Sequence, residues 1–354
     1  MKIITIAFTI FISFTSALKA DVTITFEKTD CPNQICGSGR SIYVDGEIGP
    51  DDANRLESEI VANGSPAYST VYFNSPGGSL FAGIEIGRLI RKYEYNTAIG
   101  TYSANSGYYD NGADCFSACT LAYLGGVFRY VSDKSIYGVH RFYSQIQTGE
   151  AEQSAQVASG AIISFLKDME ISSDFFIEMT KAGPDSIKLI PANQMLTMGL
   201  SNNGSGPTTW SINASQDNGS GSFLYLKGER NTVFGVNKII FACSSSRDGI
   251  AMHVIYDPQG RDEEAKRMLA ITIALDDMNL DLSNNLEGQI EIVNGWANAT
   301  FSIPDRIWSL VPRSQEISVF FQAAKDAPIF LGINAMPLNG AKDLISGLSN
   351  TCAK

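Results

Sequence analysis

The apolar positions in the first half of the sequence alternate between runs of strand length and repeats of helical spacing. Strands are expected at residues 41–46, 70–73 and 97–100. Helices are expected at residues 51–61, 79–93, 117–126 and 158–169. In the second of these helices, four apolar residues recur at the spacing of one helix face: Ala82, Ile86, Leu89 and Tyr93. The strand–helix–strand order predicts parallel strands joined by right-handed crossovers, and therefore an α/β fold.

The second half of the sequence has a different pattern, with short apolar and β-branched runs separated by Asp, Asn, Gly and Pro. Strands are expected at residues 233–242, 251–256, 269–275, 289–293 and 317–321, and a closing helix at 341–348. This pattern predicts a β-rich domain. His253 lies within one of the expected strands, and we interpret it as a packed or half-exposed strand residue rather than a ligand.

Residues 201–222, between the two halves, are rich in Ser, Asn and Gly and lack apolar periodicity. Such a composition is typical of a linker or a long surface loop. It divides the chain into a first domain at 21–200 and a β-rich C-terminal domain at 223–354, and both have an ordinary domain size.

The N-terminal segment has the pattern of a secretory signal peptide. Lys2 supplies a positive charge, residues 3–14 form an apolar run broken only by Thr and Ser, and Ala20 is a small residue suited to cleavage, with Ala17 as the second choice. The alternative is a membrane anchor, but the run is shorter than the ~20 residues that a spanning helix needs. We therefore expect residues 1–20 to be removed and the mature protein to be exported, to a periplasm or the outside of the cell.

The charge balance argues against a nucleic-acid partner. Among 354 residues, 26 Lys and Arg stand against 37 Asp and Glu, which gives a formal net charge of −11. Phosphate binding needs a positive surface, so this class of partner is excluded. The chain has only two histidines, His140 and His253, so any mechanism that needs an imidazole must use one of them.

The cysteine content agrees with an exported protein, because an even number of cysteines in such a chain usually forms disulfides. The preferred pairs among the six are Cys31–Cys36, Cys115–Cys119 and Cys243–Cys352. The alternative for the first four is a zinc site. Their spacings are not the tight hooks of most structural zinc sites, so we expect no metal.

Three fragments of the first half contain residues with catalytic chemistry. Residues 74–79 (Asn-Ser-Pro-Gly-Gly-Ser) form a turn between a strand and a helix, where glycines leave backbone N–H groups unhindered. Residues 115–119 (Cys-Phe-Ser-Ala-Cys) place Ser117 at a helix start, where it is either a helix cap or a nucleophile. In the third fragment, residues 137–141, His140 lies at the end of a strand.

The order and spacing of these fragments resemble the Clp-type serine proteases of the crotonase-like superfamily, over residues 41–200. The two cysteines around Ser117 make the resemblance closest to an exported Clp-like branch with a Cys-x-Ser-Ala-Cys core. The resemblance implies a crotonase/Clp-protease-like ββα superhelical domain and no cofactor. It does not cover the β-rich C-terminal domain, in which the sequence shows no recognisable site.

The resemblance also assigns roles to residues of this chain. It implies that Ser117 is the nucleophile and His140 the general base. The backbone N–H groups of Gly78 and Ala118 match the oxyanion hole. Asp185 is the candidate third member of the triad, although it lies about two residues from the position that the family pattern implies. The alternatives are a Ser–His dyad or another orienting acid such as Asp133.

The function expected from these residues is that of an exported serine hydrolase, a peptidase that acts without ATP on peptides or unfolded proteins. No ATPase partner is implied, because export separates the chain from cytosolic unfoldases. The family often forms rings, so a homo-oligomer is expected unless the C-terminal domain blocks it. The main alternative is a catalytically inactive Clp-like binding or assembly module. An acyl-CoA hydratase or isomerase of the same superfamily is disfavoured, because CoA is scarce outside the cytosol.

Overall fold

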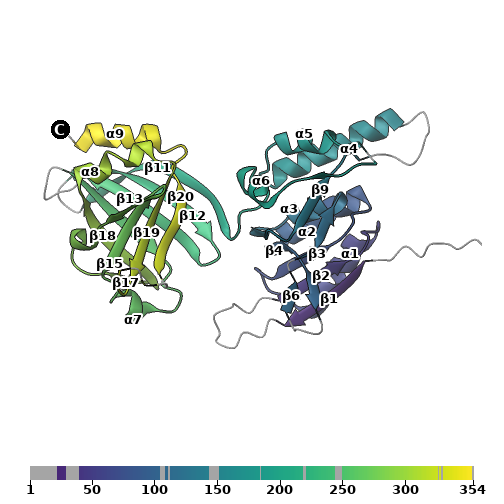
Figure 1. Ribbon diagram of the computed structural model, residues 1–354, viewed down its shortest axis with the longest axis horizontal. Coiled ribbons are helices and arrows are strands. Elements are labelled where there is room, and N and C mark those ends of the chain that lie inside the picture. Colours follow the sequence, from purple (N-terminus) through teal and green to yellow (C-terminus); the bar gives the residue numbers. More distant parts are fainter. Residues whose placement is uncertain are drawn as a thin grey trace, which may run out of the picture. The chain divides into compact units, whose positions relative to one another are not determined.

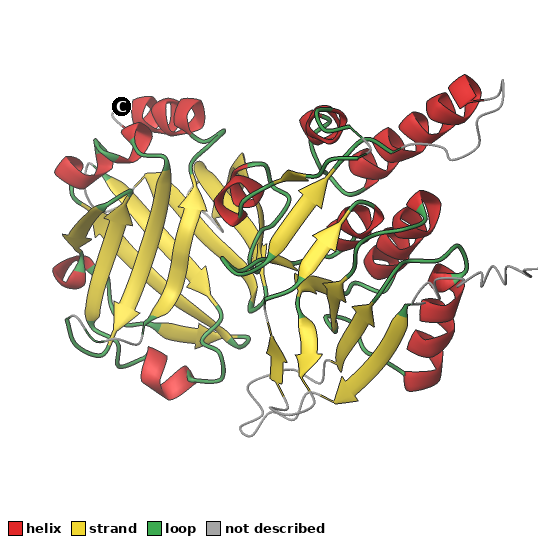
Figure 2. Cartoon of the chain, turned by 45° about the vertical axis from the view of Figure 1, so that its right-hand side comes forward, coloured by secondary structure: helices red, strands yellow, loops and turns green. Residues whose placement is uncertain are grey.

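The computed structural model describes residues 22–28, 40–103, 108–110, 112–142, 151–183, 185–217, 221–243, 249–325, 327 and 330–352. The expected signal peptide and the pair Cys31 and Cys36 lie outside these residues. The chain divides into two compact units, and the first of them ends at Ser201. Figure 1 shows the elements of both units, and Figure 2 shows their strands and helices by type. No helix in the described ranges is long and apolar enough to cross a membrane.

The first unit has a main sheet with the strand order β1-β2-β3-β4-β8. Its strands are β1 (Thr23–Lys28), β2 (Arg40–Asp45), β3 (Thr70–Asn74), β4 (Asn96–Ile99) and β8 (Arg129–Tyr130). Strands β2, β3, β4 and β8 run parallel, and β1 pairs antiparallel with β2 at the edge. The predicted α/β class and its parallel strands are therefore confirmed.

A smaller sheet with the order β10-β9-β7 carries part of the candidate site. Its strands are β7 (Asp114–Phe116), β9 (Ile136–Val139) and β10 (Lys188–Leu189). A bridge between Ser75 and Cys115 joins the end of β3 to β7. Strands β5 (Thr101–Ser103) and β6 (Tyr108–Asp110) pair antiparallel in a separate two-stranded sheet. The turn after β3 and the elbow after β7 thus come from neighbouring strands.

Four of the helices described in the first unit lie on the predicted amphipathic segments, and the two short helices after residue 170 were not predicted. The helices are α1 (Asp52–Asn63), α2 (Leu80–Lys92), α3 (Ala118–Leu124), α4 (Ala151–Asp168), α5 (Asp174–Thr180) and α6 (Ala192–Thr197). Ser79 caps α2 by accepting a hydrogen bond from the Ala82 N–H at 3.4 Å. The buried faces of these helices share one hydrophobic core with the strands. The parallel sheet and the turns that follow its strands therefore pack against the same core.

The second unit consists mainly of two antiparallel sheets around one core. The first sheet has the order β11-β12-β13-β14-β18-β17, with β11 (Ser205–Asp217), β12 (Gly221–Thr232), β13 (Gly235–Cys243), β14 (Ile250–Tyr256), β17 (Glu291–Val293) and β18 (Trp296–Ile303). The second sheet has the order β16-β15-β19-β20, with β15 (Ala270–Leu275), β16 (Met278–Asp281), β19 (Glu316–Gln322) and β20 (Leu331–Pro337). The helical segments are α7 (Asp262–Ala265), η1 (Ser283–Asn285), α8 (Asp305–Trp308), η2 (Val311–Arg313) and α9 (Lys342–Cys352).

The expected linker at 201–222 is wrong, because most of it is strand β11, which pairs along its length with β12. The second unit consequently begins at Asn202 and not at residue 223. The segment has few apolar residues because β11 lies at the edge of its sheet. Trp210 anchors it: the indole N–H donates to the Pro337 carbonyl at 2.8 Å, and the ring stacks on Phe241 at a centroid distance of 6.3 Å.

Candidate active site

Ser117 occupies a sharp turn between strand β7 and helix α3. Its backbone has φ 54° and ψ −123°, a conformation that L-residues rarely adopt. The Ser117 N–H donates to the Gly138 carbonyl at 3.0 Å, and the Ser117 carbonyl accepts from the Thr120 N–H at 3.0 Å and the Thr120 hydroxyl at 2.6 Å. A strained residue of this kind costs about 1–3 kcal/mol and persists only where its surroundings hold it, most often at a functional site.

The hydroxyl of Ser117 does not cap the helix that it precedes. Ser117 stands at the N-cap position of α3, but its side chain makes no capping hydrogen bond. Ser79 differs in this respect, since its hydroxyl caps α2. The simple interpretation of Ser117 as a helix cap therefore does not hold, and its oxygen is available for other chemistry.

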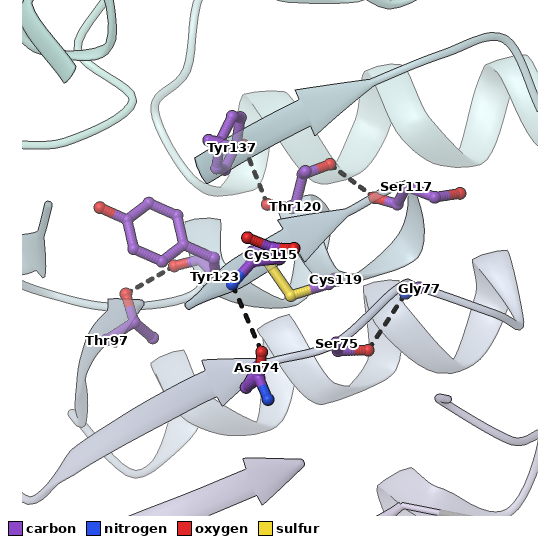
Figure 3. The surroundings of a disulfide bond; sticks show 11 residues. Asn74, Ser75, Gly77, Thr97, Cys115, Ser117, Cys119, Thr120, Tyr123 and Tyr137 are labelled. Carbon is purple, nitrogen blue, oxygen red and sulfur yellow. Dashed lines mark hydrogen bonds between the residues drawn. A yellow bond between two sulfur atoms is a disulfide. The ribbon is translucent and has the colours of Figure 1, made fainter. Parts of the chain in front are cut away.

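A disulfide joins Cys115 and Cys119 across this turn, as Figure 3 shows. The Cα atoms are 5.3 Å apart, and Cys115 lies on β7, outside the helix that contains Cys119. The second predicted pair that falls within the described chain, Cys243–Cys352, is also bonded. These two pairings are confirmed, so these cysteines cannot be zinc ligands. The described residues contain no cluster suited to a metal ion.

Two buried tyrosines, Tyr123 of α3 and Tyr137 of β9, pack against each other near the turn. Tyr137 donates its hydroxyl to the Thr120 carbonyl at 3.2 Å, and its ring meets that of Tyr123 edge to face at 5.6 Å. Burial raises the pKa of Tyr137 well above its ordinary value, and it raises the pKa of Tyr123 as well. Both hydroxyls therefore stay neutral, and the two rings are part of the packing around α3 (Figure 3).

The Pro-Gly-Gly turn after β3 places two glycines against this elbow. A Cβ on Gly77 would lie 2.6 Å from the Ser117 Cβ, and Gly78 has φ +136° with its Cβ position 2.2 Å from the Ile48 carbonyl oxygen. Only glycine fits such contacts. Ile48 donates to the Gly77 carbonyl at 2.7 Å and accepts from the Ser79 N–H at 2.8 Å, which fixes the peptide of Gly78 between them.

The backbone N–H groups of Gly78 and Ala118 have no acceptor among the described residues. Ala118 is the first residue of α3, where a helix leaves its N–H groups unpaired. Both residues line the same cleft as Ser117. Two unpaired backbone donors beside a serine hydroxyl are the groups from which an oxyanion hole can be built.

His140 follows strand β9 and is partly buried. Its Nδ1 lies 2.7 Å from the Arg141 carbonyl oxygen. A carbonyl oxygen only accepts, so Nδ1 carries the proton, and Nε2 of the neutral ring is left as an acceptor. This is the tautomer that a general base for a serine hydroxyl requires.

A cleft of about 610 Å³ brings these groups together. Its lining includes Gly78, Ser117, Ala118, Thr120 and His140. The lining also includes Glu47, Ile48, Gly49, Pro50, Phe142 and Met179, among others. The residues predicted as nucleophile, base and oxyanion donors therefore line one cavity. The sequence analysis missed the other lining residues, because loop and apolar residues have no distinctive pattern.

Asp185 is not brought into this cleft. It is exposed in the turn before β10, does not line the cavity, and makes no hydrogen bond to His140 within the described ranges. Asp133, the other orienting acid considered, is exposed in the turn before β9. The group that engages Nδ1 is the Arg141 carbonyl, which sequence reasoning missed because every residue has a carbonyl.

His253 lies in the second unit and makes no part of this cleft. Its Nδ1 lies 2.8 Å from the Thr300 hydroxyl, and its Nε2 lies 3.2 Å from Asn298 Oδ1. Burial lowers the pKa of His253, against the smaller opposing effect of the Asn298 hydrogen bond. It is a packed strand residue, as predicted.

No family model and no curated protein matches the sequence. Solved structures with similarity to the chain include ClpP1 from Listeria monocytogenes, at 17% identity and TM-score 0.33, covering 46% of this chain and 88% of that chain. A variant of that protein gives 17% identity and TM-score 0.35 with the same coverage, 46% and 88%. A variant of the 1510-N membrane-bound stomatin-specific protease gives 18% identity and TM-score 0.34, covering 46% of this chain and 75% of that chain.

Proposed function

We propose that this chain is a serine hydrolase, and specifically a peptidase, in which Ser117 is the nucleophile and His140 the general base. One observation carries the proposal: Ser117 is held in a strained backbone conformation, its hydroxyl makes no helix-capping hydrogen bond, and it lines a cleft that is also lined by His140. Strained backbone conformations of this kind cluster at functional sites, so the strain at Ser117 supports a functional role for this residue.

The proposed mechanism uses the groups around the cleft in sequence. His140 Nε2 takes the proton of the Ser117 hydroxyl as its oxygen attacks a substrate carbonyl. The N–H groups of Gly78 and Ala118 bind the oxyanion that forms, and His140 then returns the proton to the leaving amine. Water repeats the same steps to release the acyl group from Ser117.

The orientation of His140 in this proposal comes from the Arg141 carbonyl, which accepts from Nδ1. It holds the ring in the required tautomer without a buried carboxylate, so a Ser–His dyad is sufficient. Asp185 is still proposed as the third member of a catalytic triad, and the variant Asp185→Asn tests this role. A role in orienting His140 predicts a fall in kcat of tenfold or more, whereas a solvent-exposed loop acid predicts no change.

We further propose peptides or unfolded proteins as substrates, without ATP and in an exported compartment. The support is the open cleft of about 610 Å³, the signal-like N-terminus and the disulfides. A homo-oligomer is part of the proposal, and size-exclusion chromatography with light scattering tests it.

The test of the proposed function is labelling of the purified, oxidised protein with a fluorophosphonate probe, with the modified peptide located by mass spectrometry. Label on Ser117 that disappears in Ser117→Ala and in His140→Ala would support the proposal. Ser58→Ala, an exposed serine of α1, and His253→Gln, the second histidine, are matched controls that should label normally. Correctly folded wild type without label would refute the proposal and favour the inactive binding module.

A further inference from the structure

The disulfide Cys115–Cys119 encloses the whole elbow that carries the candidate nucleophile. Its loop contains Ser117 and Ala118, so the proposed nucleophile and one oxyanion donor both lie between the bonded cysteines. Both cysteines are fully buried and belong to the core of the first unit. Figure 3 shows the disulfide inside the fold and Ser117 directed away from it.

Hydrogen bonds hold the two ends of this elbow separately. Before the turn, the Phe116 N–H donates to the Ser75 carbonyl at 3.0 Å. After the turn, Thr120 binds the Ser117 carbonyl through its N–H and its hydroxyl. The disulfide is a second covalent link, beside the main chain, from the strand to the first turn of the helix, and the Cα atoms that it joins are 5.3 Å apart.

We propose that Cys115 and Cys119 are positioning residues whose disulfide keeps Ser117 in its reactive conformation, so that the hydrolase reaches its full reactivity when these thiols are oxidised during folding. This inference rests on the proposed function. A residue with a positive φ relaxes towards ordinary backbone angles when its anchors can separate. Without the bond, the hydroxyl and the Ala118 N–H would both leave their aligned positions for part of the time.

The oxidation balances as a thiol–disulfide exchange. The thiols of Cys115 and Cys119 lose two protons and two electrons and form the S–S bond, and a disulfide oxidant takes up both and becomes two thiols. In the folded protein the buried sulfurs are out of reach of a thiolate, so the bond must form before the core closes. An oxidising compartment would provide such an oxidant, and a reducing one would leave the site unaligned.

The experiment measures fluorophosphonate inactivation of the full chain as kinact and KI separately. It compares oxidised wild type, wild type refolded with a dithiol present, and the double variant Cys115→Ala/Cys119→Ala, with Cys115→Val/Cys119→Ala as a second variant that leaves less empty volume. The matched control removes the other disulfide by Cys243→Ala/Cys352→Ala. Hydrogen exchange of the peptide containing Ser117 and Ala118 is recorded for each preparation and reports on the elbow without requiring activity.

We expect kinact to fall by about 5-fold to 150-fold without the Cys115–Cys119 bond, the range that corresponds to the cost of one strained residue. KI should stay within twofold, because most of the cleft lining lies outside the loop, and exchange at the elbow should accelerate. The control should keep the wild-type kinact. An unchanged kinact, an equal loss in the control, or a KI that rises as much as kinact falls would overturn the inference.

The failure of the proposed function gives a different result. Wild type that is folded but never labelled would refute the serine hydrolase, and the exchange data would still decide whether the disulfide orders the elbow. If neither double variant folds, the dithiol-refolded wild type supplies the comparison. Equal exchange rates at the elbow with and without the bond would then overturn the positioning role.

Discussion

Replacing Ser117 by glycine should leave the first unit more stable than replacing Ser117 by alanine, although both changes remove the proposed nucleophile. At φ 54° and ψ −123°, a residue with a side chain carries a cost of about 1–3 kcal/mol that glycine avoids. Glycine also loses about 0.5–1 kcal/mol relative to alanine through its greater freedom in the unfolded chain. The difference leaves Ser117→Gly more stable than Ser117→Ala by about 1 kcal/mol.

The distribution of tryptophans decides the assay. All three, Trp210, Trp296 and Trp308, lie in the second unit, so their fluorescence follows the unfolding of that unit alone. The first unit is better followed by hydrogen exchange of peptides from α3 (Ala118–Leu124). A gain of about 1 kcal/mol should slow the exchange of its most protected amides about fivefold relative to Ser117→Ala.

The tryptophan transition is the internal control and should be the same in wild type and in both variants. If Ser117→Gly is no more stable than Ser117→Ala, the strain at Ser117 is no larger than the about 0.5–1 kcal/mol that glycine loses in the unfolded chain, and it falls below the range assigned to it. The observation on which the proposed function depends would then be lost, whatever the labelling experiment shows.

Three further predictions concern other parts of the molecule. Gly78→Ala should reduce the rate of fluorophosphonate labelling at least tenfold and destabilise the first unit by about 1–3 kcal/mol, because the new Cβ would lie 2.2 Å from the Ile48 carbonyl oxygen. Labelling at the wild-type rate would refute the assignment of Gly78 to the oxyanion hole. Cys243→Ala/Cys352→Ala should lower the free energy of unfolding of the second unit by about 2–5 kcal/mol, because the disulfide closes a loop with a sequence separation of 109. Urea unfolding followed by tryptophan fluorescence measures the loss, and a loss below about 1 kcal/mol would contradict the prediction. Burial lowers the pKa of His253 in the folded protein, so the unfolded chain binds a proton at His253 at a higher pH than the folded chain does. The second unit should therefore lose stability as the pH falls below 6.5, the ordinary pKa of histidine. The same pH dependence of stability in His253→Gln would disprove this prediction.

The parts of the fold that follow from local pattern were predictable. Strand β3, its Pro-Gly-Gly turn and the Ser79-capped helix α2 lie where the apolar spacing placed them. The pairing of Cys115 with Cys119 also agreed with expectation. The predicted helix start at residue 117 leaves Cys115 outside the helix, and the structure places Cys115 on β7.

Features that depend on tertiary surroundings were not predictable. The composition of β11 is that of a loop, and the segment is a strand because β12 supplies its backbone partners and Trp210 its anchor. The partner of His140 was sought among acids, whereas the structure places the Arg141 carbonyl there. Backbone groups leave no trace in composition, so this part of the site could be found only in three dimensions.

Helix α3 is buried along its entire length, and this burial limits which residues of the cleft lining can change during evolution. Every residue from Ala118 to Leu124 is enclosed by the core, so a substitution there disturbs packing before it changes what the cleft accepts. Other lining residues, such as Glu47, Pro50 and Phe142, are exposed or partly exposed and can vary at little cost to the fold. Under the proposed function, selection for new substrates would therefore act on these residues and leave α3 unchanged.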